Sequence, residues 1–167
     1  MTDAKDPHIA FASALAEPGG QPQRAYEALR ALTNAVVGTK LFTILALDHA
    51  GGYMHRLFSD NLELYPVPGA DAIGDTVWER TIIGKRQPLV LNTAAELAAV
   101  LPEYPKLAAL GCHSMLNLPI VVGGVSIGTL NMLGDEGHFS PERVARAFSL
   151  TAAAATCLLM SKETAND

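Results

Sequence analysis

The sequence contains little cysteine, few aromatic residues and no concentration of positive charge. Two cysteines in 167 residues are too few for a disulfide scaffold, and their number fits a reducing compartment. The longest basic run is Lys85-Arg86 and the net charge is −5. Binding to nucleic-acid phosphates or to an anionic membrane surface therefore has little support. We expect neither nucleic acid nor a membrane as a partner.

The sequence shows neither a long apolar run nor the apolar core of a secretory signal. No stretch approaches the roughly 18 consecutive apolar residues of a membrane span. The first residues, MTDAKDPHIAF, place acidic side chains where a secretory signal has an apolar core. The chain is 49% hydrophobic and 17% charged, which is typical of a folded domain. These features predict a single cytoplasmic domain with a substantial core.

The two ends of the chain are expected to lie outside the main domain. Residues 1–20 form an Ala-rich extension that predicts a short helix from Pro7 to Glu17. Residues 21–162 hold the domain, and residues 163–167 form a C-terminal tail.

Apolar periodicity and helix or strand breakers predict the order of elements within the domain. The stretch LPIVVGGVSIGTLNML, residues 118–133, reads as a hairpin because Gly123 and Gly124 can both take the positive φ of a two-residue turn. Residues 41–47 and 53–58 predict a second pair of strands. The other expected elements are helices at 22–36, 75–83, 93–100, 105–111 and 141–162, a strand at 88–91 and a loop at 59–74.

This order predicts an α+β fold with a central antiparallel sheet of about five to six strands and helices on both faces. The hairpin strands do not alternate cleanly between apolar and polar residues, which favours a sheet covered on both sides. The closing helix is apolar over a wide arc and needs two partners. We expect one to be the sheet and the other a second subunit, which gives a homodimer through the terminal helices.

Three linked stretches carry a family resemblance. They are GDTVWERTIIGKRQPLVLN, then SMLNLPIVVGGVSIGTLNML, then FSPERVARAFSLTAAAA. In this order and spacing, from Pro22 to Leu159, the chain resembles the GAF domain family. The resemblance implies a GAF/PAS-like fold and a small-molecule-binding sensory or regulatory module. Because no output segment is visible in the sequence, we expect it to signal to a separate partner protein. The resemblance selects no cofactor.

The resemblance also implies a ligand pocket on one face of the sheet, closed by residues 59–74, 75–83 and 93–113. Such pockets are mainly apolar with a few placed polar groups. Each candidate has a structural alternative: Trp78 as plain core, Asn131 as a partner of nearby backbone, Glu79 as a solvated helix residue. The candidate aromatic walls are Phe58, Tyr65 and Trp78, and the candidate polar groups are Glu79, Asn92, His113, Asn117 and Asn131.

The alternative function is a GAF-fold enzyme that acts on a small organic substrate in the same pocket. His113, Cys112 or Glu79 would then be the acid–base or nucleophilic group. Cys112 and His113 are neighbours, so in an extended chain they point to opposite faces and do not bond each other. Free methionine-(R)-sulfoxide reductases of this fold use several cysteines in this region, whereas this chain has one. No histidine pair has the spacing that metal sites favour, so no metal is expected.

Overall fold

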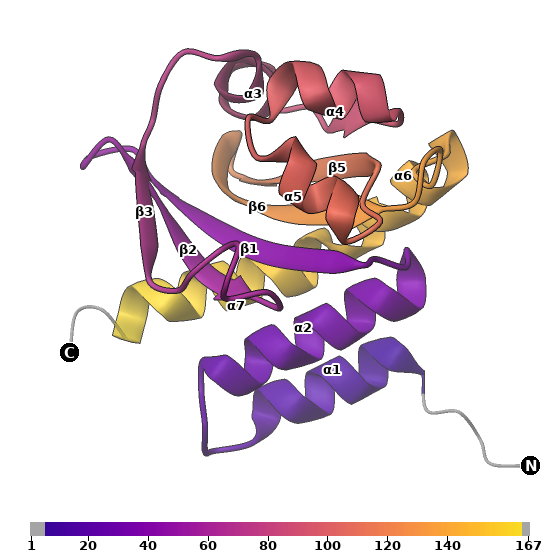
Figure 1. The fold of residues 1–167 in the computed structure, drawn as a ribbon. Coiled ribbons are helices and arrows are strands. Elements are labelled where there is room, and N and C mark those ends of the chain that lie inside the picture. Colours follow the sequence, from indigo (N-terminus) through magenta and orange to yellow (C-terminus); the bar gives the residue numbers. More distant parts are fainter. Residues whose placement is uncertain (1–5, 165–167) are drawn as a thin grey trace, which may run out of the picture.

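The protein is built on one antiparallel sheet of six strands (Figure 1). A computed structural model describes residues 6–164, and in it the strand order is β3-β2-β1-β6-β5-β4. The predicted α+β fold, with five to six strands and helices on both faces, is confirmed. The strands are β1 (Leu41–Asp48), β2 (Tyr53–Ser59), β3 (Gly69–Ala72), β4 (Leu89–Leu91), β5 (Ser114–Val122) and β6 (Val125–Gly134).

The hairpin of β5 and β6 lies in the sheet interior, as predicted. Gly123 and Gly124 both have positive φ, +57° and +79°, which closes the hairpin in two residues. Strand β5 begins at Ser114, four residues before the predicted start. Most of its side chains are buried. Beside this hairpin, β1 pairs along β6 from Leu41 to Ala46. The centre of the sheet is therefore β1, β6 and β5.

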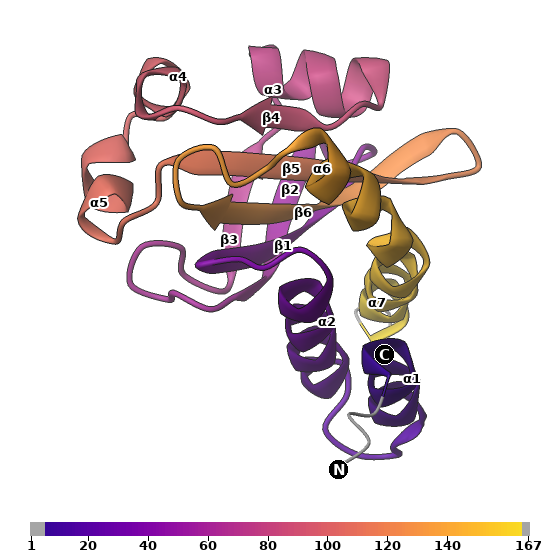
Figure 2. The same cartoon turned by 90° about the vertical axis from the view of Figure 1, so that its right-hand side faces the viewer.

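One face of the sheet is covered by helices from both ends of the chain (Figure 2). The main core lies there, between the sheet and buried side chains such as Leu29, Leu32 and Leu158. Helix α7 packs closely on the sheet at Gly128, where a Cβ atom would lie 2.6 Å from the Leu158 side chain. The helices are α1 (Pro7–Ala16), α2 (Gln23–Val36), α6 (Pro141–Ala147) and α7 (Thr151–Thr164), with a 3-10 turn at Phe148–Leu150.

The opposite face carries three short helices and a second, smaller core (Figure 1). Thr93 caps one of them through a capping box with Glu96, as the sequence predicts. Leu97 and Leu107 from two of these helices are fully buried against Met115 of β5. The helices are α3 (Val77–Glu79), which continues as a π-helix (Arg80–Lys85), α4 (Ala94–Val100) and α5 (Tyr104–Ala109).

Two element predictions were wrong. Residues 59–74 were expected to be a loop, but Gly69–Ala72 pairs with β2 as edge strand β3. Its sequence, GADA, has no β-branched or aromatic residue, so composition could not indicate a strand. The helix expected to end at Gly84 continues to Lys85, and the residue that takes the left-handed conformation is Arg86, at φ 57°.

The closing helical segment is both long and apolar. Pro141–Lys162 is long and apolar enough for a span by length and composition alone. Charged and polar residues interrupt this segment, so it contains no uninterrupted apolar run of span length. Leu150, Ala154 and Cys157 of this segment are fully buried in the main core. Core helices pass the same length and composition test, so the test by itself carries little weight.

The predicted division of the chain is only partly visible. Helix α1 packs on α2, and its Phe11 is buried in the main core. The first five residues of the predicted extension 1–20 lie outside the described residues. So do the last three of the predicted tail 163–167. The division into extension, domain and tail stays a prediction.

Candidate functional site

A cavity of about 140 Å³ lies between the central strands and the short helices of the second face. Its floor is made by residues of β1, β6 and β5 that point away from the main core. Its walls come from α3, from the segment before β3 and from the chain between α4 and α5. The lining residues are Leu41, Thr43, Leu45, Arg56, Tyr65, Trp78, Leu101, Glu103, Met115, Asn117, Asn131 and Leu133.

Strand register places three polar side chains side by side on the cavity floor. Thr43 of β1 is opposite Asn131 of β6, and Asn131 is opposite Asn117 of β5. Directly opposite residues in an antiparallel sheet present their side chains on the same face. The row therefore crosses three strands at one level. Asn117 and Thr43 are buried, so each needs hydrogen-bond partners.

These side chains satisfy one another in a continuous chain of hydrogen bonds. The indole Nε1–H of Trp78 donates to Oδ1 of Asn117 at 3.1 Å, and Nδ2 of Asn117 donates to Oδ1 of Asn131 at 2.7 Å. Nδ2 of Asn131 donates to Oγ1 of Thr43 at 3.0 Å, and the Thr129 hydroxyl also donates to Asn131. The Asn131 amide bonds neighbouring side chains, and it lines the cavity.

Trp78 is held at the cavity by the capping of its short helix. The Thr76 hydroxyl accepts the Trp78 backbone N–H and donates to the carboxylate of Glu79. That carboxylate also accepts the backbone N–H groups of Gly74, at 3.1 Å, and of Thr76, at 2.8 Å. Burial of Glu79 raises its pKa, but these hydrogen bonds outweigh burial and leave the pKa below its usual value. Glu79 is thus a charged cap with both oxygens occupied.

The remaining polar wall joins three side chains through Tyr65. The guanidinium of Arg56 lies over the Tyr65 ring, 5.1 Å from its centroid. The Tyr65 hydroxyl donates to Oε1 of Glu103 at 3.0 Å. Burial, and then the neighbouring Glu103 carboxylate, raise the pKa of Tyr65 far above its usual value. The phenol is therefore a neutral donor at physiological pH.

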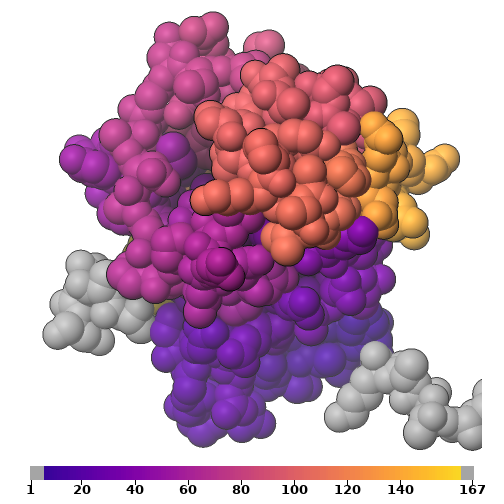
Figure 3. Space-filling view, in the orientation of Figure 1, coloured from indigo at the N-terminus to yellow at the C-terminus, as the bar shows by residue number. Residues whose placement is uncertain are grey.

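The cavity opens toward a recess of about 490 Å³. The two spaces share five lining residues, Leu45, Trp78, Leu101, Glu103 and Met115. Figure 3 shows the molecule hollowed between the magenta atoms around β3 and α3 and the orange atoms around α5. Trp78 lines both the cavity and the recess. A small molecule entering the recess would meet this indole.

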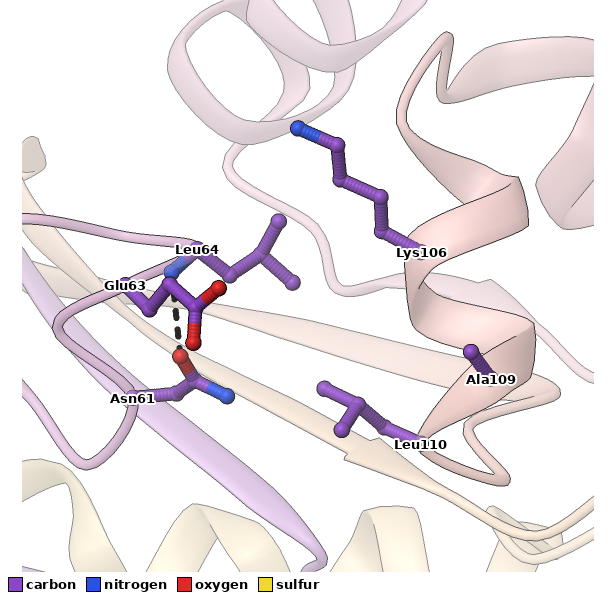
Figure 4. Close-up of a pocket in the computed structure, with 6 residues that line it drawn as sticks. All are labelled: Asn61, Glu63, Leu64, Lys106, Ala109 and Leu110. Carbon is purple, nitrogen blue, oxygen red and sulfur yellow. Dashed lines mark hydrogen bonds between the residues drawn. The ribbon is translucent and has the colours of Figure 1, made fainter.

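A second cleft, of about 320 Å³, lies between the turn after β2 and helix α5 (Figure 4). In the figure Glu63 and Lys106 stand on its two sides, and the Asn61 side chain turns back to accept the Leu64 N–H at 3.0 Å. Glu63, Lys106 and Leu110 are exposed, so the cleft offers no desolvated polar group. We place the candidate site at the cavity that Trp78 borders.

The structure brings together most of the residues that the sequence suggested. Tyr65, Trp78, Asn117 and Asn131 all line the enclosed cavity, and Glu79 borders the adjoining recess. Trp78, Asn117 and Asn131 lie in one chain of hydrogen bonds, which the sequence could not indicate. Their involvement in ligand binding stays a prediction.

The side chain of Phe58 lies on the opposite face of the sheet from this cavity. A β-bulge between Ile44 and Leu45 shifts the register, so Phe58 pairs with Ile44 while Arg56 pairs with Leu45. Regular alternation would have put both side chains on one face. Phe58 instead packs against Tyr26 and Phe42 in the main core. Its suggested role as an aromatic wall is corrected.

Asn92 and His113 also lie away from the cavity lining. The Asn92 amide donates to the Phe139 carbonyl at 2.9 Å and accepts its N–H at 3.1 Å, so it fastens the end of β4 to the loop before α6. Nδ1 of His113 is 2.8 Å from the Tyr104 hydroxyl. Both side chains serve local structure, and neither lines the enclosed cavity.

Sequence reasoning missed Arg56, Glu103 and Thr43 on the cavity wall. Arg56 was missed because nothing in the sequence of β2 indicates that this charged side chain is largely buried. Glu103 lies between two short helices, where no periodicity applies. Thr43 could have been found, since it is a polar residue inside the apolar run of β1 and is paired across the sheet with Asn131.

The proposed acid–base and nucleophilic residues have ordinary structural surroundings. Cys112 is buried in the second core beside Leu107, and burial raises the pKa of its thiol. Its neighbour His113 bonds Tyr104, and Glu79 caps its own helix. Residues 6–164 contain no group of three or more His, Cys, Asp or Glu side chains arranged to hold a metal ion.

Comparison with protein families agrees with this architecture. Residues 23–158 match the family model described as GAF domain. The chain belongs to the GAF domain family. GAF domains are typically sensory or regulatory domains. A comparison with curated protein sequences finds no match.

Solved structures of other GAF domains share the fold at low sequence identity. The GAF domain of a phosphoenolpyruvate-protein phosphotransferase from Coxiella burnetii has a TM-score of 0.68 at 17% identity, covering 96% of this chain and 95% of that chain. The GAF domain of a two-component sensor histidine kinase from Bacillus halodurans has a TM-score of 0.64 at 16% identity, covering 89% and 100%. A type II free methionine-R-sulfoxide reductase from Thermoplasma acidophilum has a TM-score of 0.54 at 16% identity, covering 80% and 94%. These similarities concern the fold alone.

Proposed function

We propose that this GAF domain binds a small organic molecule in the cavity beside Trp78 and acts as a sensory or regulatory module. The carrying observation is the hydrogen-bond chain from Trp78 through Asn117 and Asn131 to Thr43 on the cavity floor. A structural core would usually place apolar residues at the centre of three strands. A row of amides beside an apolar cavity is instead suited to orienting a ligand.

The proposed signal begins at α3, because Trp78 connects that helix to the sheet. A ligand that contacts the indole differently in two arrangements would shift the population between them. Helix α3 continues into a π-helix, and π-helical segments are frequent at functional sites. The Ser126 hydroxyl on β6 donates to the Ile82 carbonyl of this π-helix at 2.7 Å, so a movement there would reach the sheet. A separate protein would receive the output.

The proposal includes a homodimer formed through the terminal helices. Apolar side chains are exposed on this side of the sheet, with Ile9 at 59% and Leu159 at 49%. A Leu159→Lys variant is expected to run as a monomer in light scattering where the wild type is a dimer. Leu62→Lys, at a 62% exposed loop position, is the matched control and should stay dimeric. A monomeric wild type, or a dimeric Leu159→Lys variant, would contradict this part.

The binding proposal is tested by a thermal-shift screen with cyclic nucleotides, amino acids, aromatic acids, purines and haem. A ligand at one hundred times its Kd adds about 2.7 kcal/mol of stability. For a domain of this size that corresponds to a shift in Tm of several degrees. Each compound that stabilises the wild type is then tested on Leu45→Phe, which narrows the cavity and the recess together.

The matched control is Leu62→Phe, the same substitution on the exposed loop. Stabilisation by the ligand should be lost in Leu45→Phe and kept in Leu62→Phe. Equal stabilisation of both variants would place the ligand elsewhere. The absence of any stabilising compound across the panel would contradict the proposed function.

A further inference from the structure

We infer that the ligand of this cavity carries a carboxylate, and that Arg56 binds it. The inference rests on the proposed function and adds the chemical class of the ligand. Among the described residues that line the cavity, Arg56 is the only one with a cationic side chain. Its side chain is only 14% exposed, although a guanidinium is charged under all physiological conditions.

The donors of this guanidinium are incompletely used by the protein. Nη1 donates to the Pro66 carbonyl at 3.3 Å, near the upper limit for a hydrogen bond. Nε is buried and has no hydrogen-bond partner. A buried donor without an acceptor is destabilising, so a group held in this state suggests a missing partner. The fork of Arg donors matches a carboxylate, which can accept two parallel hydrogen bonds.

The nearby carboxylates leave room for an anion. Asp71 approaches Nη2 only to 3.9 Å, and its side chain is 67% exposed, so the ion pair is long and solvated. Glu103 lies at the hydroxyl end of Tyr65, whereas the Arg56 guanidinium lies over the ring. Tyr65 thus stands between the two charges and takes one acceptor site of Glu103. A ligand carboxylate on the Arg56 side would replace the weak pairing with Asp71.

The rest of the lining indicates what the carboxylate is attached to. Leu41, Leu45, Met115 and Leu133 present apolar surface from the sheet, and Trp78 presents an aromatic face at the entrance. The amides of Asn117 and Asn131 add a polar strip between them. The complementary molecule is a small carboxylic acid with an apolar or aromatic body.

The inference is tested with matched pairs of acids and their primary amides, which differ in charge and hardly in shape. The probes are benzoate and benzamide, phenylacetate and phenylacetamide, and hexanoate and hexanamide. Binding is measured by calorimetry at pH 7.5 and by the fluorescence of Trp78, the single tryptophan of the chain. We expect at least one acid to bind about tenfold or more tightly than its amide, because charge-assisted bonds to Arg are the strong ones.

Two variants assign the preference to Arg56. In Arg56→Gln the ratio of acid to amide affinity should fall to about one, and Arg56→Lys, which keeps the charge without the fork, should retain part of it. Arg24→Gln, the same substitution at an exposed position of α2 away from the cavity, is the matched control and should keep the preference. Thermal unfolding of each variant checks that it folds. If Arg56→Gln fails to fold, the ratio of acid to amide affinity is compared between the wild type and Arg56→Lys. An unchanged ratio in Arg56→Lys would then overturn the inference.

The outcomes separate this inference from the proposed function. Amides that bind as tightly as their acids would overturn the carboxylate inference and leave cavity binding standing. An acid preference that persists in Arg56→Gln would also overturn it. If neither acids nor amides bind, the carboxylate inference is overturned. The broader thermal-shift panel then decides whether binding at the cavity fails as well.

Discussion

The indole Nε1–H of Trp78 donates to Oδ1 of Asn117 at 3.1 Å, and this contact joins helix α3 to the middle of the sheet. The two residues are far apart in sequence, on a short capped helix and on strand β5. Because Asn117 continues the chain of hydrogen bonds to Asn131, one contact connects the α3 wall of the cavity to its floor. The stability of the site and its proposed role in ligand binding both depend on this relationship.

Replacing Asn117 with leucine should destabilise the protein and loosen Trp78. The variant keeps the side-chain volume but leaves the indole N–H without its acceptor and removes one of the two donors to Oδ1 of Asn131. We expect a loss of about 2 kcal/mol in the free energy of unfolding, within the range for buried polar groups deprived of partners. Urea denaturation measures it, and Gln87→Leu at an exposed position is the control. Equal stability of the two variants would contradict the role given to this bond.

The Glu79 carboxylate should stabilise the fold in a pH-dependent way. Its pKa is lowered in the folded state, so its contribution is fully present above its unfolded pKa and is lost as the pH falls through the folded pKa. Glu79→Gln is expected to cost about 1 kcal/mol at pH 7, the usual scale for a helix cap. The difference from wild type should narrow below pH 4.3, roughly the ordinary Glu value. A pH-independent difference in unfolding free energy would be evidence against a charged cap.

Gly128 should tolerate no side chain, because the sheet and α7 meet there. A Cβ atom would lie 2.4 Å from the Leu45 carbonyl oxygen and 2.6 Å from Leu158. Gly128→Ala should therefore lower the free energy of unfolding by about 2 kcal/mol through overpacking. Gly19 has open space and an ordinary φ, so Gly19→Ala is the matched control. Thermal melts in which both variants match wild type would show that α7 can shift away from the sheet.

The two cysteines should resist alkylation in the folded protein. Cys112 and Cys157 are both buried, and burial raises the pKa of the Cys157 thiol to about 12 and that of Cys112 above its usual value. Because the thiolate is the reactive form, iodoacetamide at pH 8 should modify neither residue until the protein is unfolded. Mass spectrometry of native and denatured samples measures this. Rapid modification of native Cys112 would revive its role as a nucleophile.

The sequence could predict the fold because its signals were local. Paired glycines at Gly123 and Gly124, a capping box at Thr93 and an N-cap at Ser140 each determine an element without distant contacts. Strand β3 escaped prediction because its pairing with β2 depends on tertiary contact and not on its own residues. The register of β1 against β2 likewise depends on a bulge that no local pattern announced.

The site was predictable where residue type alone mattered. A lone tryptophan, a tyrosine and two asparagines in an apolar setting were good candidates because such residues need partners or a purpose. Phe58 was assigned to the wrong side of the sheet, because its placement depends on one extra residue in the β1–β2 ladder, and Arg56 was missed. Asn92 and His113 were plausible by type, but their partners, Phe139 and Tyr104, could not be read from spacing.

The most direct test of binding at this cavity is the indole N–H resonance of Trp78 in a proton–nitrogen NMR spectrum. The chain has one tryptophan, so the signal needs no assignment. During titration with the compound that stabilises the protein most, we expect this resonance and the side-chain amides of Asn117 and Asn131 to shift and saturate with one Kd. A saturating titration that leaves the indole resonance unmoved, with shifts confined to other parts of the protein, would contradict ligand binding at this cavity.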